Sequence, residues 1–139
     1  MSEQSTGVTA PGQPVAGVIG LGIMGGAFAR NLLKAGFTVI GHDVLEANTQ
    51  ALVSEGVIAA AHARDVAEQS DIVITSLPTA SSFHDVISGS NSIATAAKPG
   101  LIVIECSTLT IEDKQLACSA LLEKGTVLLD CPVLSLIHI

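Results

Sequence analysis

The segment VAGVIGLGIMGGAFARNLLKAG, residues 15–36, joins a short apolar run to three glycines spaced as G-x-G-x-x-G, at Gly20, Gly22 and Gly25. The apolar run VAGVI is bounded by Pro14 and a glycine, which predicts a short buried strand. From Met24 onward, apolar residues recur every three or four positions, and Gly36 follows as a C-terminal cap, which predicts a helix. A strand that turns through glycines directly into a helix indicates a layered α/β domain.

The rest of the chain repeats this alternation of strand and helix. Apolar runs predict further strands at 37–43, 57–61, 71–78, 101–108 and 126–133, with helices at 45–56, 62–70, 81–89, 91–100 and 111–125. These runs lack a period-two alternation, which favours parallel strands covered on both faces. We therefore expect one doubly wound α/β domain over residues 15–133, a parallel sheet of the Rossmann dinucleotide-binding type.

Composition excludes several functional classes. The formal net charge of −7 leaves no basic stripe for nucleic acid, and an aromatic content of 2% leaves no base-stacking platform. The three cysteines and four histidines lack metal-ligand spacing, so no metal site is expected. No apolar run is long enough to cross a membrane. Residues 1–14 are polar and lack a signal-peptide layout, so we expect a flexible tail on a cytoplasmic protein.

The three glycines have separate roles in a phosphate-binding turn. In a doubly wound sheet the ligand lies beyond the carboxyl ends of the strands, where the strand order reverses. Gly20 permits the tight turn, Gly22 leaves room for a pyrophosphate, and Gly25 allows close packing of helix and strand. The following helix directs its free N–H groups toward the phosphates. The alternative interpretation is a purely structural turn.

Asp43 ends the second predicted strand and is the candidate partner of the adenosine ribose. A carboxylate at this place accepts hydrogen bonds from the ribose hydroxyls and repels a 2′-phosphate. No arginine follows nearby to bind such a phosphate, so NAD is expected in preference to NADP. The alternative is that Asp43 only caps the next helix in solvent.

The motif GLGIMGGAFARNLLKAGFTV resembles the opening signature G-L-G-x-M-G of the β-hydroxyacid dehydrogenase family. This family includes 3-hydroxyisobutyrate dehydrogenase and, more distantly, 6-phosphogluconate dehydrogenase. The similarity continues through Leu77-Pro78 and Ser107-Thr108 to the D-x-P-V pattern at 130–133. It implies a domain that binds NAD(P) in an oxidoreductase that oxidises a β-hydroxy acid, such as 3-hydroxyisobutyrate or threonate, by hydride transfer.

The resemblance also implies which residues bind the cofactor. The adenosine half is assigned to Gly20, Leu21, Gly22, Ile23, Met24, Gly25 and Asp43. Leu77, Pro78 and Ser82 are expected to line the middle of the cofactor, and Thr108 to approach the nicotinamide.

The sequence departs from the family after Val133. The family's S-G-G turn, which holds the substrate carboxylate, is replaced by LSLIHI, and no lysine stands in the context of the family's catalytic lysine. No catalytic residue is therefore assigned, the helical C-terminal domain is expected to be missing, and the chain itself is expected to be inactive. Residues 134–139 resemble an in-frame translation of the transposase mosaic end used in sequencing libraries, which predicts a non-native end.

Two other classes of function stay open. The chain could be a stand-alone NAD(H)-binding sensor or regulatory module without catalysis, or a fragment that binds nothing. For the full-length protein we expect a small hydroxy-acid substrate and a homo-oligomer, with neither nucleic acid nor membrane as a partner.

Overall fold

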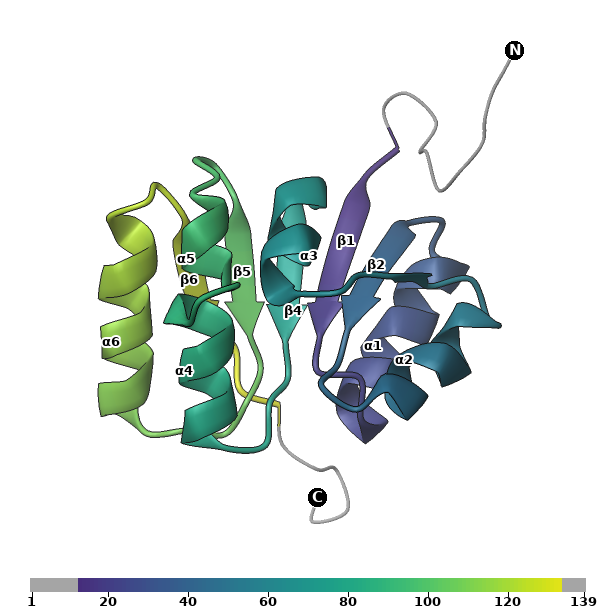
Figure 1. Ribbon diagram of the computed structural model, residues 1–139, viewed down its shortest axis with the longest axis horizontal. Coiled ribbons are helices and arrows are strands. Elements are labelled where there is room, and N and C mark those ends of the chain that lie inside the picture. The colour runs from purple at the N-terminus through teal and green to yellow at the C-terminus, as the bar shows by residue number, and fades with distance from the viewer. Residues whose placement is uncertain (1–12, 134–139) are drawn as a thin grey trace.

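The computed structural model describes residues 13–133. The expected tail over residues 1–14 falls almost entirely outside this range, and the expected non-native end, residues 134–139, falls outside it completely. The described residues form a six-stranded parallel sheet in the order β3-β2-β1-β4-β5-β6 (Figure 1). Its strands are β1 (Val15–Ile19), β2 (Thr38–His42), β3 (Ile58–Ala59), β4 (Ile72–Thr75), β5 (Ile102–Glu105) and β6 (Val127–Asp130).

The helices lie in two layers, one on each face of the sheet. One layer contains α1 (Ile23–Lys34) and α2 (Glu46–Val53), and the other contains α3 (Ala63–Gln69), α4 (Ala80–Ser88), α5 (Ile93–Ala96) and α6 (Ile111–Leu122) (Figure 1). The chain moves outward from β1 through β2 to β3, then crosses back to β4 and continues in the opposite direction. Because parallel crossovers are right-handed, this reversal places the two sets of helices on opposite faces.

The predicted doubly wound α/β fold is confirmed, with each predicted strand and helix present in the predicted order. The strands are shorter than their apolar runs. The clearest case is β3, which pairs with β2 only through Ile58 and Ala59 although the apolar run extends over 57–61. Alanine has a low strand propensity and little surface to pack, which explains why this edge strand is so short.

Two apolar clusters fill the space between sheet and helices. Successive strand residues point to opposite faces, so Val18 joins the cluster under α1 and α2 while Ile19 joins the cluster under α3–α6. The larger cluster includes the fully buried Phe83 of α4, and the smaller one includes Leu52 of α2. Each helical layer is thus fixed to the sheet by its own core.

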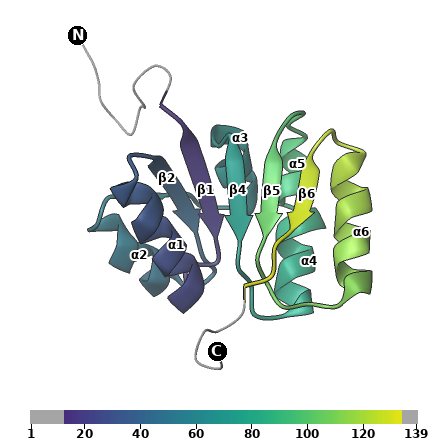
Figure 2. The ribbon, with the colours of Figure 1, turned by 180° about the vertical axis from the view of Figure 1, so that it is seen from behind.

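One face of β5 and β6 is not covered by any helix of residues 13–133 (Figure 2). Ile102, Val127 and Leu129 on this face are 38%, 44% and 45% exposed. The paired register places Ile102 beside Val127, and Ile104 beside Leu129, so these side chains form a continuous apolar surface. Among the described helices, none is long and apolar enough to cross a membrane.

Candidate cofactor site

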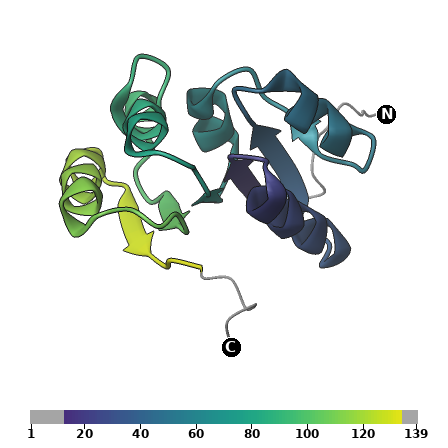
Figure 3. The same ribbon diagram turned by 90° about the horizontal axis from the view of Figure 1, so that it is seen from below.

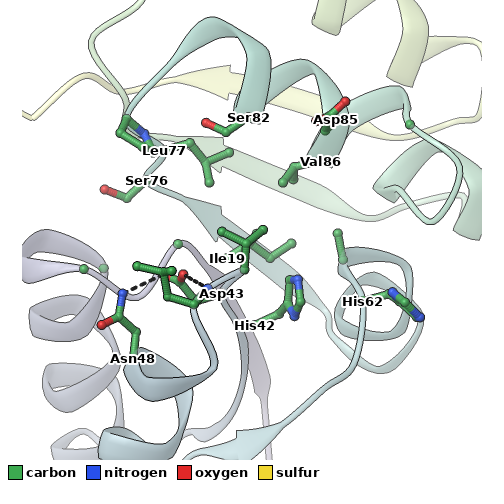
Figure 4. Close-up of a pocket in the computed structure, with 18 of the residues that line it drawn as sticks. Ile19, His42, Asp43, Asn48, His62, Ser76, Leu77, Ser82, Asp85 and Val86 are labelled. Carbon is green, nitrogen blue, oxygen red and sulfur yellow. Dashed lines mark hydrogen bonds between the residues drawn. The ribbon is translucent and has the colours of Figure 1, made fainter.

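A cavity opens at the carboxyl edge of the sheet, where the strand order reverses between β1 and β4. Figure 3 looks onto this edge, with α1 and α4 on opposite faces of the sheet. The cavity has a volume of about 810 Å³, which lies in the range of small-molecule and cofactor sites. One wall comes from the ends of β1 and β2 with the start of α1, and the other comes from the end of β4 with α4 (Figure 4).

The three glycines of the turn differ in what surrounds them. A Cβ on Gly20 would overlap the carbonyl oxygen of Ser76, and the φ angle of Gly20 is +92°. A Cβ on Gly25 would overlap the carbonyl oxygen of Gly20. Gly22 is different, because a Cβ there would have no described atom within 4 Å, and its φ angle of −73° suits any residue. Protein packing therefore explains two of the glycines and leaves open space in front of the third.

Helix α1 begins directly after Gly22 and is open at its N-terminus. No side chain of residues 13–133 caps this end, and its first turn carries no acidic residue. The first intrahelical hydrogen bond is donated by Gly26 N–H to Gly22 O, at 2.7 Å. The N–H groups before it have no intrahelical acceptor and carry the positive end of the helix dipole. This arrangement is suited to an anionic group such as a phosphate.

Asp43 joins the end of β2 to the glycine turn. Its Oδ2 accepts hydrogen bonds from Leu21 N–H at 2.6 Å and from the Asn48 side-chain amide at 3.4 Å. Its Oδ1 accepts from Leu45 N–H at 2.8 Å, and Leu45 is the N-cap of α2. Asp43 thus contacts the start of α2, as the capping alternative expects, and also lines the cavity. Each carboxylate oxygen has two lone pairs, so acceptor capacity remains for a ligand.

The opposite wall is formed by Leu77 and Pro78 after β4 and by Ser82 in α4 (Figure 4). Ser82 is part of a capping box: its N–H donates to Thr79 Oγ1 at 3.1 Å, and its hydroxyl oxygen accepts from Thr79 N–H at 3.3 Å. The capping box therefore fixes the start of α4, and with it the position of Ser82 at the cavity.

The structure brings most of the sequence-predicted site residues together. The cavity is lined by Gly20, Gly22, Ile23, Met24, Gly25, Asp43, Leu77, Pro78 and Ser82. Leu21 is outside this lining, because its side chain is 4% exposed and packs in the core under α1 and α2. Thr108 is also outside it, exposed on the loop after β5.

Several lining residues were not predicted from the sequence. Asn48 and His62 lie on the β2 side of the cavity, and Asp85 and Val86 lie on α4 (Figure 4). These residues come from helices or helix starts, where no glycine or strand end marks them. Only the position of Asn48, in the first turn of the helix that follows Asp43, offers a signal. No cluster of three metal-binding side chains occurs within residues 13–133.

The sequence matches a family model described as the NAD binding domain of 6-phosphogluconate dehydrogenase over residues 15–135. It is 38% identical over 117 residues to 2-(hydroxymethyl)glutarate dehydrogenase of Eubacterium barkeri, covering 84% of this chain and 39% of that protein. It is 36% identical over 115 residues to NAD-dependent L-serine dehydrogenase of Pseudomonas aeruginosa, covering 83% of this chain and 39% of that protein.

A solved structure is similar to this chain in both fold and sequence. The crystal structure of 3-hydroxyisobutyrate dehydrogenase from Salmonella typhimurium aligns with a TM-score of 0.80 and 32% identity, covering 88% of this chain and 43% of that one. The chain therefore spans about two fifths of the length of these three relatives. The match over nearly all described residues, on a doubly wound sheet with an open glycine turn, shows that this chain belongs to the NAD-binding-domain family of 6-phosphogluconate dehydrogenase, with relatives among the 3-hydroxyisobutyrate dehydrogenases.

Proposed function

We propose that this chain binds NAD(H) as the dinucleotide-binding domain of an oxidoreductase acting on a β-hydroxy acid. The observation that carries the proposal is the open space at Gly22, beside the uncapped start of α1. A pyrophosphate in that space would meet free N–H groups and the positive end of the helix dipole. The adenosine ribose would then lie over β2, within reach of Asp43. When the cofactor is bound, its nicotinamide ring is the group that accepts the hydride.

The proposed preference for NAD over NADP rests on Asp43. A 2′-phosphate near its carboxylate would meet a like charge, and the next residues, Val44, Leu45 and Glu46, provide no cation. The relatives include a protein named NAD-dependent L-serine dehydrogenase, which agrees with this choice. Solved structures of the same fold carry either NADP⁺ or NAD⁺, so the proposed preference depends on the local charge at Asp43 alone.

For the full-length protein we propose a small hydroxy-acid substrate, because the relatives are named as dehydrogenases of hydroxymethylglutarate, serine and 3-hydroxyisobutyrate. A cytoplasmic homo-oligomer is part of the same proposal. No residue of this chain is assigned a catalytic role, so we expect the 139-residue chain to bind cofactor without turnover. A stand-alone NAD(H)-binding module is the alternative, and the genomic sequence beyond codon 133 separates the two. An S-G-G turn followed by a lysine-bearing helical domain supports the dehydrogenase.

Fluorescence titration with NADH tests the proposed site, with NADPH titrated in parallel. Wild type should bind NADH more tightly than NADPH, and Asp43→Ala should weaken NADH binding by about tenfold, the equivalent of one charge-assisted hydrogen bond. Glu46→Ala is the matched control, because Glu46 is an exposed acid three residues away that does not line the cavity. A folded wild-type chain that binds no NADH would overturn the proposal.

A further inference from the structure

A charged pair is buried at the carboxyl edge of the sheet, next to the proposed cofactor site. Glu105, the last residue of β5, is 0% exposed, and Lys114 of α6 is 7% exposed. Lys114 Nζ lies 3.6 Å from Glu105 Oε2. Burying two charges in a domain this small is costly, and such a pair seldom adds net stability over apolar residues. The geometry around the pair shows what it holds in place.

Glu105 binds the loop that follows its own strand. Its carboxylate accepts hydrogen bonds from Ser107 N–H at 3.1 Å and from the Ser107 hydroxyl at 2.7 Å. It also accepts a bond from the hydroxyl of Thr75, the last residue of β4, at 2.7 Å. The loop after β5 is therefore fixed to the ends of two adjacent strands by one carboxylate.

The hydroxyl of Ser107 extends this connection to the cavity wall. This hydroxyl donates a hydrogen bond to Glu105 and at the same time accepts one from Leu77 N–H at 2.7 Å. Leu77 lines the cavity on the β4 side. The backbone N–H of Leu77 can only donate, so the Ser107 hydroxyl accepts from it and directs its own single proton to the Glu105 carboxylate. The cavity wall at Leu77 is thus linked through Ser107 to the buried carboxylate.

Lys114 completes the arrangement from α6. Its ammonium group donates to Ser107 O at 2.7 Å and to Asp130 Oδ1 at 2.5 Å, at the end of β6. The carboxylate of Glu105 and the ammonium group of Lys114 thereby join the carboxyl ends of β4, β5 and β6. Both charged groups have partners, which is the condition for keeping charges in a protein interior.

We propose that Ser107, oriented by the Glu105–Lys114 pair, is a positioning residue for the nicotinamide half of the dinucleotide. The inference rests on the proposed function. Asp43 lies on the β2 side of the switch point and the glycine turn follows β1, so an extended dinucleotide that starts at β2 has its second half over β4 and β5. That half is where Ser107 fixes Leu77, and where the exposed Thr108 follows directly.

Comparison of NADH with ADP-ribose tests this assignment, because ADP-ribose lacks the nicotinamide. Ser107→Ala should lower NADH affinity by about tenfold, because Leu77 N–H loses the acceptor that fixes this part of the cavity wall. It should leave ADP-ribose affinity within about twofold of wild type. Ser107→Thr, which keeps the hydroxyl, should restore NADH affinity. Ser119→Ala is the matched control, because Ser119 is exposed on α6 away from the cavity.

The outcomes separate this inference from the proposed function. Equal losses of NADH and ADP-ribose affinity in Ser107→Ala, or no loss of either, would overturn the positioning role while leaving the cofactor site intact. A wild-type chain that binds neither ligand would overturn both. Nuclear magnetic resonance on the wild type tests the inference even where Ser107→Ala does not fold. NADH should shift the amide resonances of Leu77 and Ser107 more than ADP-ribose does, and equal shifts would contradict the inference.

Discussion

The carboxylate of Asp43 accepts a 2.6 Å hydrogen bond from the backbone N–H of Leu21, so the end of β2 holds the glycine turn at the end of β1. Asp43 therefore has two separable contributions, one to the turn and one to the ribose. Asp43→Ala leaves the Leu21 and Leu45 N–H groups without this acceptor and should lower the free energy of unfolding by about 1–3 kcal/mol.

Asp43→Asn separates the two contributions, because its one amide oxygen can still accept from Leu21 N–H, while Leu45 N–H loses its acceptor and the negative charge is gone. We expect Asp43→Asn to retain part of the stability that Asp43→Ala loses, while its preference for NADH over NADPH decreases. Urea denaturation and parallel titrations with the two cofactors measure the two effects. Equal destabilisation by both variants would show that the charge, rather than the acceptor geometry, holds the turn.

Substitution by alanine should affect stability very differently at Gly22 and at Gly25. A Cβ at position 22 enters open space at a normal φ angle, so Gly22→Ala should lower the free energy of unfolding by no more than about 1 kcal/mol, the cost of alanine at an N-cap. It should still weaken NADH binding, because the methyl group would occupy the space proposed for the pyrophosphate. A Cβ at position 25 overlaps the carbonyl of Gly20, and Gly25→Ala should cost about 3 kcal/mol or more.

Thermal unfolding and NADH titration of the two variants check this pair of expectations. Gly22→Ala with wild-type NADH affinity would remove the main observation behind the proposed function. A Gly25→Ala variant as stable as wild type would mean that α1 can shift away from β1.

The sequence predicted those features that depend on neighbouring residues. The glycine turn and the order of the elements are both local patterns. The contacts of Ser107 were not predictable in this way. Ser107 is 30 residues from Leu77, and the bond between them depends on β4 and β5 pairing in one particular register.

The side chain of Leu21 is a different case, because the sequence assigned it to the site and it does not line the cavity. It lies inside the glycine motif, which favours assigning it to the ligand, yet it packs into the core under α1 and α2. A motif specifies which backbone segment approaches a ligand. Which side chains turn inward is decided by the packing of α1 on the sheet, and the motif does not contain that information.

Removing the cation of the buried pair should destabilise the domain strongly. Lys114→Met leaves the fully buried Glu105 carboxylate without its positive partner, which costs about 3–5 kcal/mol in comparable sites. Lys124→Met is the matched control, since Lys124 is exposed just beyond α6 and should change stability by less than about 0.5 kcal/mol. Urea denaturation measures both. Similar midpoints for the two variants would show that the carboxylate does not need the ammonium group.

Cys106 and Cys131 should differ in reactivity toward thiol reagents. Burial, followed by the negative charge of Glu105 and by Cys131, raises the pKa of the Cys106 thiol to about 11. Since the thiolate is the reactive form, Cys106 should stay almost unmodified near about pH 8, where the exposed Cys131 reacts. Iodoacetamide labelling followed by peptide mass spectrometry compares the two rates. Cys106 reacting as fast as Cys131 would contradict the protected environment.

Asp113 should make the stability depend on pH in the acid range. Hydrogen bonds from His84 first, and then from Thr110, hold the pKa of Asp113 below its ordinary value of 3.8. A carboxyl whose pKa is lower in the folded state stabilises the fold above its unfolded pKa, and this contribution disappears as the pH falls through the folded pKa. The difference in free energy of unfolding between wild type and Asp113→Asn should therefore be constant near neutral pH and shrink below about pH 4.

Urea denaturation of both proteins from neutral pH down to about pH 3 measures this difference. Glu112→Gln is the matched control, because Glu112 is an exposed acid in the same first turn of α6, so both substitutions alter the charge at this helix end alike. If the difference for Asp113→Asn stays constant to the lowest pH, or if Glu112→Gln shows the same decline, the hydrogen bond to His84 does not stabilise the ionised carboxyl. A decline specific to Asp113 would show that the contact between α4 and α6 is held by this carboxylate.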